Sequence, residues 1–327
     1  MDRSNIVLWG GNGFRNMGDE FVDLGSKYMI EKSSGYSVSH VSSVPKSFLT
    51  RGYFPSMKHI DLLINGNITS KKENLLDVRK HAKDEYIVTS GCVLTPGWLK
   101  KCLDNYDQYS EKKIIFNGVG GGNYSSEEVR EVKKILKDIK PYAIITRDEK
   151  AYKHYKKDAK YTHNGIDCAF FINDYFDSLL DLKMGDYITF CFDKTKNTPS
   201  SKKYNRKVIH THHSANSLTG LIKNIVYTKL YTRRGFDQKS TLVSDLPTEY
   251  LSVYLHTEET HSDRVHACLP TLLFGNEARL YNDTERSLLF DRVGIKGIKE
   301  RLVKLDIDRL NDLKDSHLEF LGKIMRE

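Results

Sequence analysis

Arg264 and His266 stand two residues apart, where a polar loop gives way to an apolar run. Residues 251–257 before them predict a strand, and residues 267–274 after them have the apolar spacing of a helix packed on a sheet. We therefore expect both side chains near the carboxyl end of a strand, the edge at which ligands bind in open α/β sheets. The first turn of the helix would offer free N–H groups and its positive dipole end, so this place predicts an anion site.

A second candidate is the glycine and asparagine loop WGGNGFRNMGDE, residues 9–20. Gly11 would let the backbone approach a ligand closely, and the side chains of Asn12 and Asn16 can donate hydrogen bonds. The spacing is not the GxGxxG of a dinucleotide-binding fold. A tight turn between a strand and a helix, capped by polar residues, is the alternative interpretation.

The stretch NGVGGGNYSSEE, residues 117–128, is another glycine-rich loop, and it includes Gly121. Ser125 and Glu128 have the spacing of a capping box for the helix that follows. The loop favours phosphate binding, although glycine-rich turns also occur without a ligand.

Arg147 and Asp148 lie at the predicted end of a strand, in TRDEKAY. An arginine at a strand end can bind an anionic substrate. The alternative is a surface ion pair between the two residues, which would contribute little to stability or function.

His210 and His212 alternate onto one face of a predicted strand, as metal ligands do. No Asp, Glu or Cys stands beside them at ligand spacing, so we predict no metal site. Two basic stretches, residues 193–207 and 229–239, mix cations with aromatic residues as a nucleic-acid surface does, although solvated loops have the same composition.

These residues need elements to position them, and the first half of the chain alternates strand and helix patterns. That rhythm predicts a parallel, doubly wound sheet. The pattern loosens after residue 174 and a new strand begins near residue 186, so we predict a domain boundary near residue 180. An α/β lobe of residues 1–180 would carry the glycine-rich loops, and a second of residues 181–327 the Arg-x-His motif and amphipathic terminal helices.

The composition is that of a globular protein. A length of 327 residues suits two domains with a cleft between them. The five cysteines form no CxxC pair, which fits a reducing compartment, and no apolar run approaches a membrane span or a signal peptide. We therefore expect a cytoplasmic protein. A net charge of +8 is compatible with nucleic acid, an anionic membrane surface or a small anionic substrate.

Taken in order, the motifs resemble those of the polysaccharide pyruvyl transferase family. The matching pieces are GNGFRNMGDE, GVGGG, TRDE, Asp167 in GIDCAFF, and DRVHACLPTLLFG leading into ARLYNDTERSLLFDRVG. The resemblance implies two Rossmann-like lobes of the GT-B type, with phosphoenolpyruvate between them and no further cofactor. It also implies a sugar or lipid-linked glycan as acceptor, which would allow peripheral contact with a membrane.

Carried onto this sequence, the resemblance assigns donor binding to Arg147, Arg264 and Arg286. The family pattern usually has lysine where this chain has Arg286, a planar fork in place of a compact ammonium. Arginines suit both the carboxylate and the phosphate of the donor. Ketal formation needs a proton at the methylene carbon, for which His266 is the expected general acid, and Asp19 or Glu20 would accept the proton of a sugar hydroxyl. A helix N-cap is the alternative role for Asp19.

Two other function classes are compatible with the sequence. A nucleotide-sugar glycosyltransferase of the same fold would use Arg264 to bind a diphosphate. A nucleic-acid-binding protein would use the basic stretches between residues 194 and 239, and is the less expected of the two.

Overall fold

The computed structural model describes residues 6–10, 16–42, 85–103, 111–176, 186–195, 198–200, 203–213, 240–242, 244 and 246–327. The expected strand at 59–66, the expected helices at 71–82 and 214–231, and the boundary near residue 180 lie outside these residues, as do Gly11 and Asn12. The boundary therefore remains a prediction.

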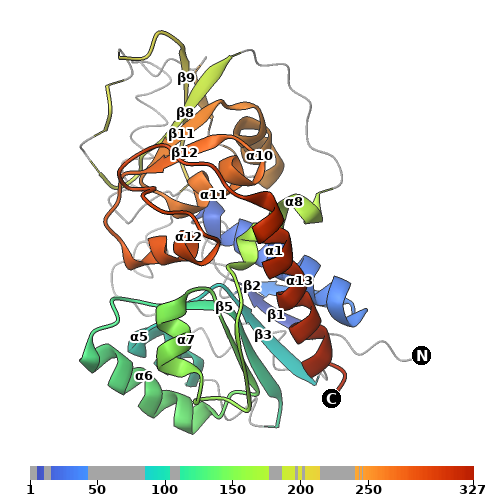
Figure 1. Cartoon of the computed structure of the whole chain (residues 1–327). Helices are drawn as coiled ribbons and strands as arrows, with labels where there is room; N and C mark the ends of the chain where they lie inside the picture. Colours follow the sequence, from blue (N-terminus) through green and yellow to red (C-terminus); the bar gives the residue numbers. More distant parts are fainter. Residues whose placement is uncertain are drawn as a thin grey trace, which may run out of the picture.

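The first lobe is built on a parallel sheet with the strand order β2-β1-β3-β5-β6-β7 (Figure 1). Its strands are β1 (Ile6–Gly10), β2 (Val38–Ser42), β3 (Tyr86–Ser90), β5 (Lys113–Gly121), β6 (Ala143–Thr146) and β7 (Tyr161–Asn164), and the short β4 (Val93–Leu94) pairs with β5. Its helices are α1 (Met17–Ser34), α5 (Pro96–Leu103), α6 (Ser126–Ile139) and α7 (Glu149–Tyr155). The expected alternation of strand and helix is confirmed for these elements.

The second lobe has a five-stranded sheet with the order β10-β9-β8-β11-β12, also parallel throughout. Its strands are β8 (Tyr187–Cys191), β9 (Lys207–Thr211), β10 (Thr241–Leu242), β11 (Glu259–Ser262) and β12 (Glu277–Leu280). Its helical elements are α10 (Pro247–His256), α11 (Val265–Leu273), the short 3-10 helix η6 (Glu285–Ser287) and α12 (Leu288–Arg292).

The strand expected at residues 251–257 is wrong, because this segment lies largely in α10. Pro247 begins the helix at a position where its fixed φ and missing N–H cost nothing. The true strand is β11, whose sequence ETHS is polar although its last three residues are buried. Thr260 tolerates burial because its hydroxyl bonds that of Thr271 at 2.7 Å. Hydrophobicity therefore pointed to the wrong segment.

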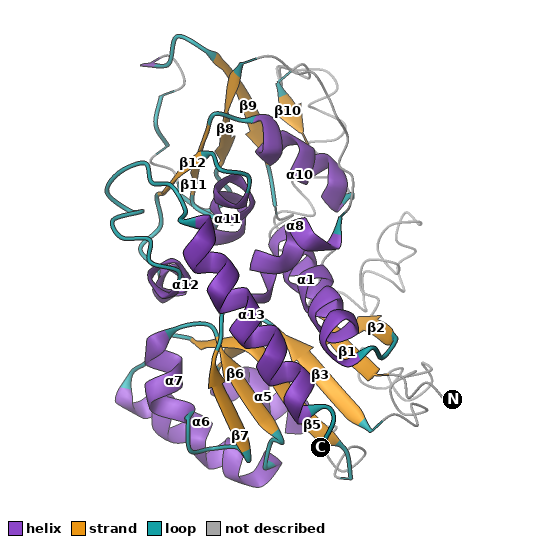
Figure 2. Ribbon diagram, turned by 45° about the vertical axis from the view of Figure 1, so that its right-hand side comes forward, coloured by secondary structure: helices purple, strands orange, loops and turns teal. Residues whose placement is uncertain are grey.

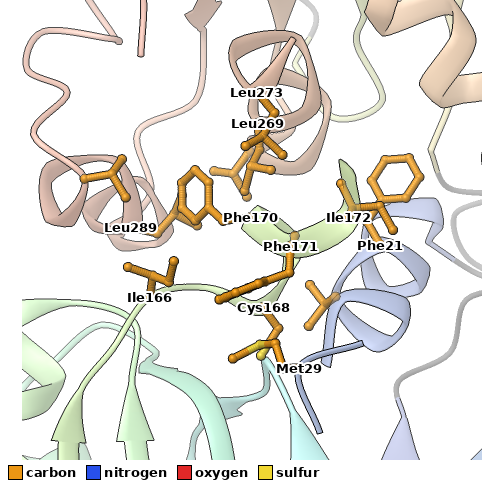
Figure 3. Close-up of a cluster of buried hydrophobic side chains, with 14 of the residues drawn as sticks. Phe21, Met29, Ile166, Cys168, Phe170, Phe171, Ile172, Leu269, Leu273 and Leu289 are labelled. Carbon is orange, nitrogen blue, oxygen red and sulfur yellow. The ribbon is translucent and has the colours of Figure 1, made fainter. Parts of the chain in front are cut away.

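A short linker joins the two sheets and forms part of the core between them. The 3-10 helix η4 (Cys168–Phe171) and α8 (Ile172–Tyr175) place Phe170, Phe171 and Ile172 in a fully buried cluster with side chains of α1, α11 and α12 (Figure 3). Because close-packed interiors resist displacement, this cluster fixes the backbone on either side of Asp167.

The expected amphipathic terminal helix is α13 (Ile307–Ile324). It runs alongside the first lobe and α1 rather than staying with the second sheet (Figure 2). The Tyr142 hydroxyl donates to the Ile324 carbonyl at 2.9 Å, and His317 Nε2 lies 2.9 Å from Asn117 Oδ1. The last element of the chain therefore ties the second lobe to the first. Among the described helices, none combines the length and the apolar composition needed to cross a bilayer.

Candidate functional site

Arg147 lies directly after β6, with its guanidinium buried against the end of β5. Its Nη1 donates to Asp167 Oδ2 at 2.8 Å and to the Gly91 carbonyl at 3.1 Å. Gly120 allows this approach, since a Cβ there would stand 2.8 Å from Arg147 Nε. The surface-pair interpretation is wrong: Arg147 and Asp148 are each only 3% exposed, and the carboxylate that Arg147 binds belongs to Asp167.

Asp167 is fully buried between the guanidinium of Arg147 and the imidazole of His266. Its Oδ2 binds Arg147 and lies 3.6 Å from Nε2 of His266, while its Oδ1 accepts from the Ala169 N–H at 2.9 Å. Burial by itself would raise the pKa of this carboxyl, but His266, Arg147 and the Ala169 N–H together lower it to about 2. Asp167 is therefore an anion that orients both Arg147 and the candidate acid His266.

His266 belongs to the first turn of α11, directly after β11, so it does lie near the carboxyl end of a strand. Its ring packs on the first turn of α1 in the other lobe. A Cβ on Gly18 would stand 2.7 Å from both Cβ and Nδ1 of His266. The absent side chain at residue 18 thus makes room for the imidazole.

Arg264 occupies the N-cap position of α11, and its side chain is mostly buried. Its Nε donates to Asp193 Oδ2 at 2.9 Å. Asp193 follows β8 and also accepts from the His213 N–H and contacts His212 Nδ1, both at 3.0 Å. Asp193 therefore holds Arg264 from the neighbouring strand end.

The two histidines considered as metal ligands have separate surroundings. His210 packs edge-on against the Phe190 ring, and His212 faces Asp193, an acid that sequence spacing did not reveal. Within the described ranges, no group of three or more His, Cys, Asp or Glu side chains has the arrangement of a metal site.

Asp19 lies in the first turn of α1, but it is not the N-cap. Asn16 is the N-cap: its Oδ1 accepts from the Gly18 N–H, and its Nδ2 donates to Asp19 Oδ1 at 2.8 Å. The capping alternative for Asp19 is therefore wrong. Burial and the neighbouring Asp23 raise the pKa of Asp19, against the opposing influence of His266, Arg286 and Arg147. A carboxylate with a raised pKa beside cations suits a general base.

Arg286 and Lys194 complete the cationic side of the site. Arg286 is exposed at the start of the segment after β12, yet surrounding protein atoms, then Arg147 and Arg264, lower its pKa. Burial, Arg264 and Arg286 likewise lower the pKa of Lys194. Asp263 fixes the turn that carries Lys194 by accepting three backbone N–H bonds, from residues 193, 194 and 195 at 3.1, 2.6 and 2.7 Å.

The second glycine-rich loop is occupied by its own side chains. The Gly121 N–H donates to the Tyr124 hydroxyl at 2.7 Å, and the Glu128 carboxylate accepts from the N–H groups of residues 122, 123 and 124. Ser125 caps α6 by accepting from the Glu128 N–H, as predicted, but the reciprocal bond of a capping box is absent, because the Ser125 N–H donates to Asn123 Oδ1 at 2.8 Å. Glu128 thus occupies the place that a phosphate would need. The Gly121 N–H is already bonded to Tyr124, so this arrangement does not support a hydrogen bond from Gly121 to a phosphate.

The structure brings together Arg147, Arg264, His266, Arg286 and Asp19, with Asn16 bound to Asp19. Sequence reasoning missed three contributors. Asp167 was visible only as part of a matching motif. Asp193 and Lys194 begin the basic stretch 193–207, which was interpreted as a nucleic-acid surface or a solvated loop. Together, four cations, a histidine and a carboxylate can bind a multiply charged anion and move protons on it.

Comparison with solved structures shows a GT-B-like fold. MnaA from S. aureus, in its co-structure with UDP, matches 98% of this chain over 91% of its own, with 11% identity and a TM-score of 0.54. UDP-N-acetylglucosamine 2-epimerase from Rickettsia bellii aligns with 98% of this chain over 96% of its own length, with 12% identity and a TM-score of 0.54. The UDP-GlcNAc 2-epimerase from Methanocaldococcus jannaschii aligns with 98% of this chain over 98% of its own length, with 14% identity and a TM-score of 0.51. At these identities the likeness establishes the fold alone.

Comparison with protein families gives a more specific result. No curated protein sequence matches the chain closely enough to count as a relative. The family model described as polysaccharide pyruvyl transferase matches residues 16–276, which include Asp19, Arg147, Arg264 and His266. The chain therefore belongs to the polysaccharide pyruvyl transferase family.

Proposed function

We propose that this protein transfers the pyruvyl group of phosphoenolpyruvate onto two hydroxyls of one sugar in a polysaccharide or glycan, forming a ketal and releasing phosphate. The observation that carries the proposal is that Asp167 contacts both Arg147 and His266, with Arg264 and Arg286 close enough to influence the same site, in a chain of the pyruvyl transferase family.

The donor carries a carboxylate and a phosphate, and the cations offer partners for both. Arginine presents several N–H donors in a planar fork that matches either group. Arg147 keeps its orientation through Asp167, and Arg264 through Asp193. The side chains of Arg286 and Lys194 are exposed. Surrounding protein atoms, and then the repulsion of neighbouring arginines, lower the pKa of both. A bound trianion would relieve that repulsion.

His266 is placed to supply the proton that starts the reaction. Protonation of the methylene carbon C3 makes C2 electrophilic, and the first sugar hydroxyl then adds to C2 while Asp19 takes its proton. The second hydroxyl displaces phosphate from C2 and its proton leaves with the phosphate. Return of the proton from Asp19 to His266 restores both groups, so the cycle is balanced.

The acceptor and the setting of the reaction belong to this proposal as well. We expect a cytoplasmic protein that acts on a free or lipid-linked glycan, with peripheral contact to a membrane in the second case. We also expect no cofactor or divalent metal, because the four cations can neutralise the donor.

The test is to incubate the protein with phosphoenolpyruvate and a panel of sugars with paired hydroxyls, with and without EDTA. We expect phosphate release together with a pyruvylated sugar detected by mass, unaffected by EDTA. Parallel reactions contain UDP-N-acetylglucosamine without phosphoenolpyruvate. Consumption of the nucleotide sugar, or phosphate release without pyruvylated sugar, would contradict the proposal.

A further inference from the structure

Outside the site, a groove of about 590 Å³ lies between α6 and α7 on the first lobe. The two helices are neighbours on one side of the sheet in both views (Figures 1 and 2). The lining residues are Tyr124, Ser126, Val129, Arg130, Lys133, Lys134, Lys137 and His154. This set contains four lysine or arginine side chains and no carboxylate.

The cations follow from the sequence of α6. Residues 126, 129, 130, 133, 134 and 137 follow the pattern i, i+3, i+4, i+7, i+8, i+11 and therefore share one face of the helix. Arg130, Lys134 and Lys137 are exposed, and Lys137 lies close enough to Asp158 to oppose the rise that burial causes in the pKa of that carboxyl. Lys133 lies 3.9 Å from Asp158 and is partly neutralised. The face spans about 16 Å along the helix.

One end of the groove is aromatic and adjoins the donor site. The rings of Tyr124 and His154 stack with centroids 5.8 Å apart. The Tyr124 hydroxyl donates to Asp148, which directly follows the donor-binding Arg147. The aromatic end of the groove therefore contacts Asp148, the residue next to Arg147 in the sequence. From there the groove leads away along α6.

We infer that this groove binds an anionic stretch of the acceptor glycan next to the sugar that receives pyruvate. The inference rests on the proposed function, because it treats the ligand as part of the acceptor. A basic groove with an aromatic end suits a single acidic sugar chain, because the cations bind its carboxylates and the stacked aromatic pair offers apolar contact to sugar C–H groups. The acceptor class would be an acidic polysaccharide.

The test measures binding of a short oligogalacturonate by calorimetry, without phosphoenolpyruvate. The groove variant combines Arg130→Ala, Lys134→Ala and Lys137→Ala. An exposed helix tolerates these substitutions because alanine has the highest helix propensity. The matched control combines Lys296→Ala, Lys299→Ala and Lys304→Ala, three exposed lysines of the second lobe. We expect the groove variant to bind the oligouronate about ten-fold more weakly and the control less than about two-fold.

Three results would overturn the inference. The first is equal weakening in both variants, and the second is no binding of the oligouronate by the unmodified protein. The third is a groove variant that keeps its oligouronate binding but loses binding to anionic lipid vesicles or to a single-stranded oligonucleotide. Neutral dextran serves as the uncharged probe. Because the measurement needs no donor, failure of the groove and failure of pyruvyl transfer give different results. A protein that binds the oligouronate through the groove but does not turn over phosphoenolpyruvate would refute the proposed function alone.

Discussion

Arg264 and His266 are two residues apart, yet their surroundings assign them different work. Arg264 is a fixed cation held by Asp193, whereas His266 can exchange a proton and faces Asp167. We expect Arg264→Ala to weaken phosphoenolpyruvate binding by about 2 to 5 kcal/mol, because a buried anionic group would lose its partner. His266→Ala should still bind the donor but turn over about 10² to 10⁴-fold more slowly.

Calorimetry for donor affinity and steady-state rates separate the two effects, with melting temperatures as a check on folding. His266→Ala protein that melts at a lower temperature but keeps its turnover number would show that the imidazole only packs the helix.

Asp19 gives a prediction for the pH profile. Its pKa is raised above the ordinary value of 3.8 by burial and by Asp23, so it becomes an ionised base only at a higher pH than an exposed carboxyl. Activity should therefore fall on the acid side at a pH above that ordinary value. Asp23→Asn should move this acid limb to lower pH, and Asp19→Asn should slow turnover without weakening donor binding. An acid limb that does not move in Asp23→Asn would remove Asp19 as the base.

At the scale of elements, the site depends on the contact between the first turns of α1 and α11. Gly18→Ala would place a methyl group 2.7 Å from the His266 ring, so the helices or the imidazole must move. Because small displacements of a catalytic group are costly, we expect turnover to fall about 10²-fold with the melting temperature little changed. Gly97→Ala is the matched control, since nothing lies within 4 Å of its added methyl group. Equal activity of the two variants would contradict this role for Gly18.

Elements were predicted from the sequence where their patterns were long and amphipathic. The Ser125 N-cap of α6 and the amphipathic α13 were recognised from spacing alone. The strand β11 was missed because its sequence is polar: its buried threonine, histidine and serine are hydrogen-bonded to Thr271, Tyr281 and the Cys191 carbonyl. The apolar α10, in contrast, has the composition of a strand.

Sites were harder to predict than elements for a physical reason. Arg147 and Arg264 could be named because each lies beyond the carboxyl end of a strand in the sheet of its own lobe, the edge at which ligands bind in parallel sheets. Their partners Asp167 and Asp193 are separated from them by 20 and 71 positions, and only the packed fold brings these carboxylates into contact. The phosphate role of the second glycine-rich loop failed because Glu128, a residue of the same segment, binds its N–H groups.

At the scale of the whole molecule, buried histidines make stability depend on pH. Burial and Arg292 lower the pKa of His163 to about 4, burial and neighbouring cations lower that of His213 to about 3, and burial lowers that of His317 well below 6.5. The unfolded chain binds protons below pH 6.5 while the folded chain does not. Stability is therefore complete above pH 6.5 and decreases toward pH 4, by at most about 1.4 kcal/mol per pH unit for each histidine.

Thermal unfolding between pH 7 and 5 measures this dependence. His163→Phe keeps the stacking on Phe320, where the ring centroids are 4.7 Å apart, but cannot titrate. Its melting temperature should fall less steeply with decreasing pH than that of the unmodified protein. An unchanged slope would show that His163 takes up its proton equally in both states.

In the proposed reaction, the site between the two lobes delivers a proton to C3 of phosphoenolpyruvate, so that C2 becomes a ketal carbon. The most direct measurement is the reaction of the unmodified protein with phosphoenolpyruvate and a competent sugar in D₂O, analysed by NMR and mass spectrometry. The account predicts a ketal whose methyl group carries one deuterium, formed in step with phosphate release. A pyruvyl product without deuterium in that methyl group, or phosphate release with no ketal, would contradict it.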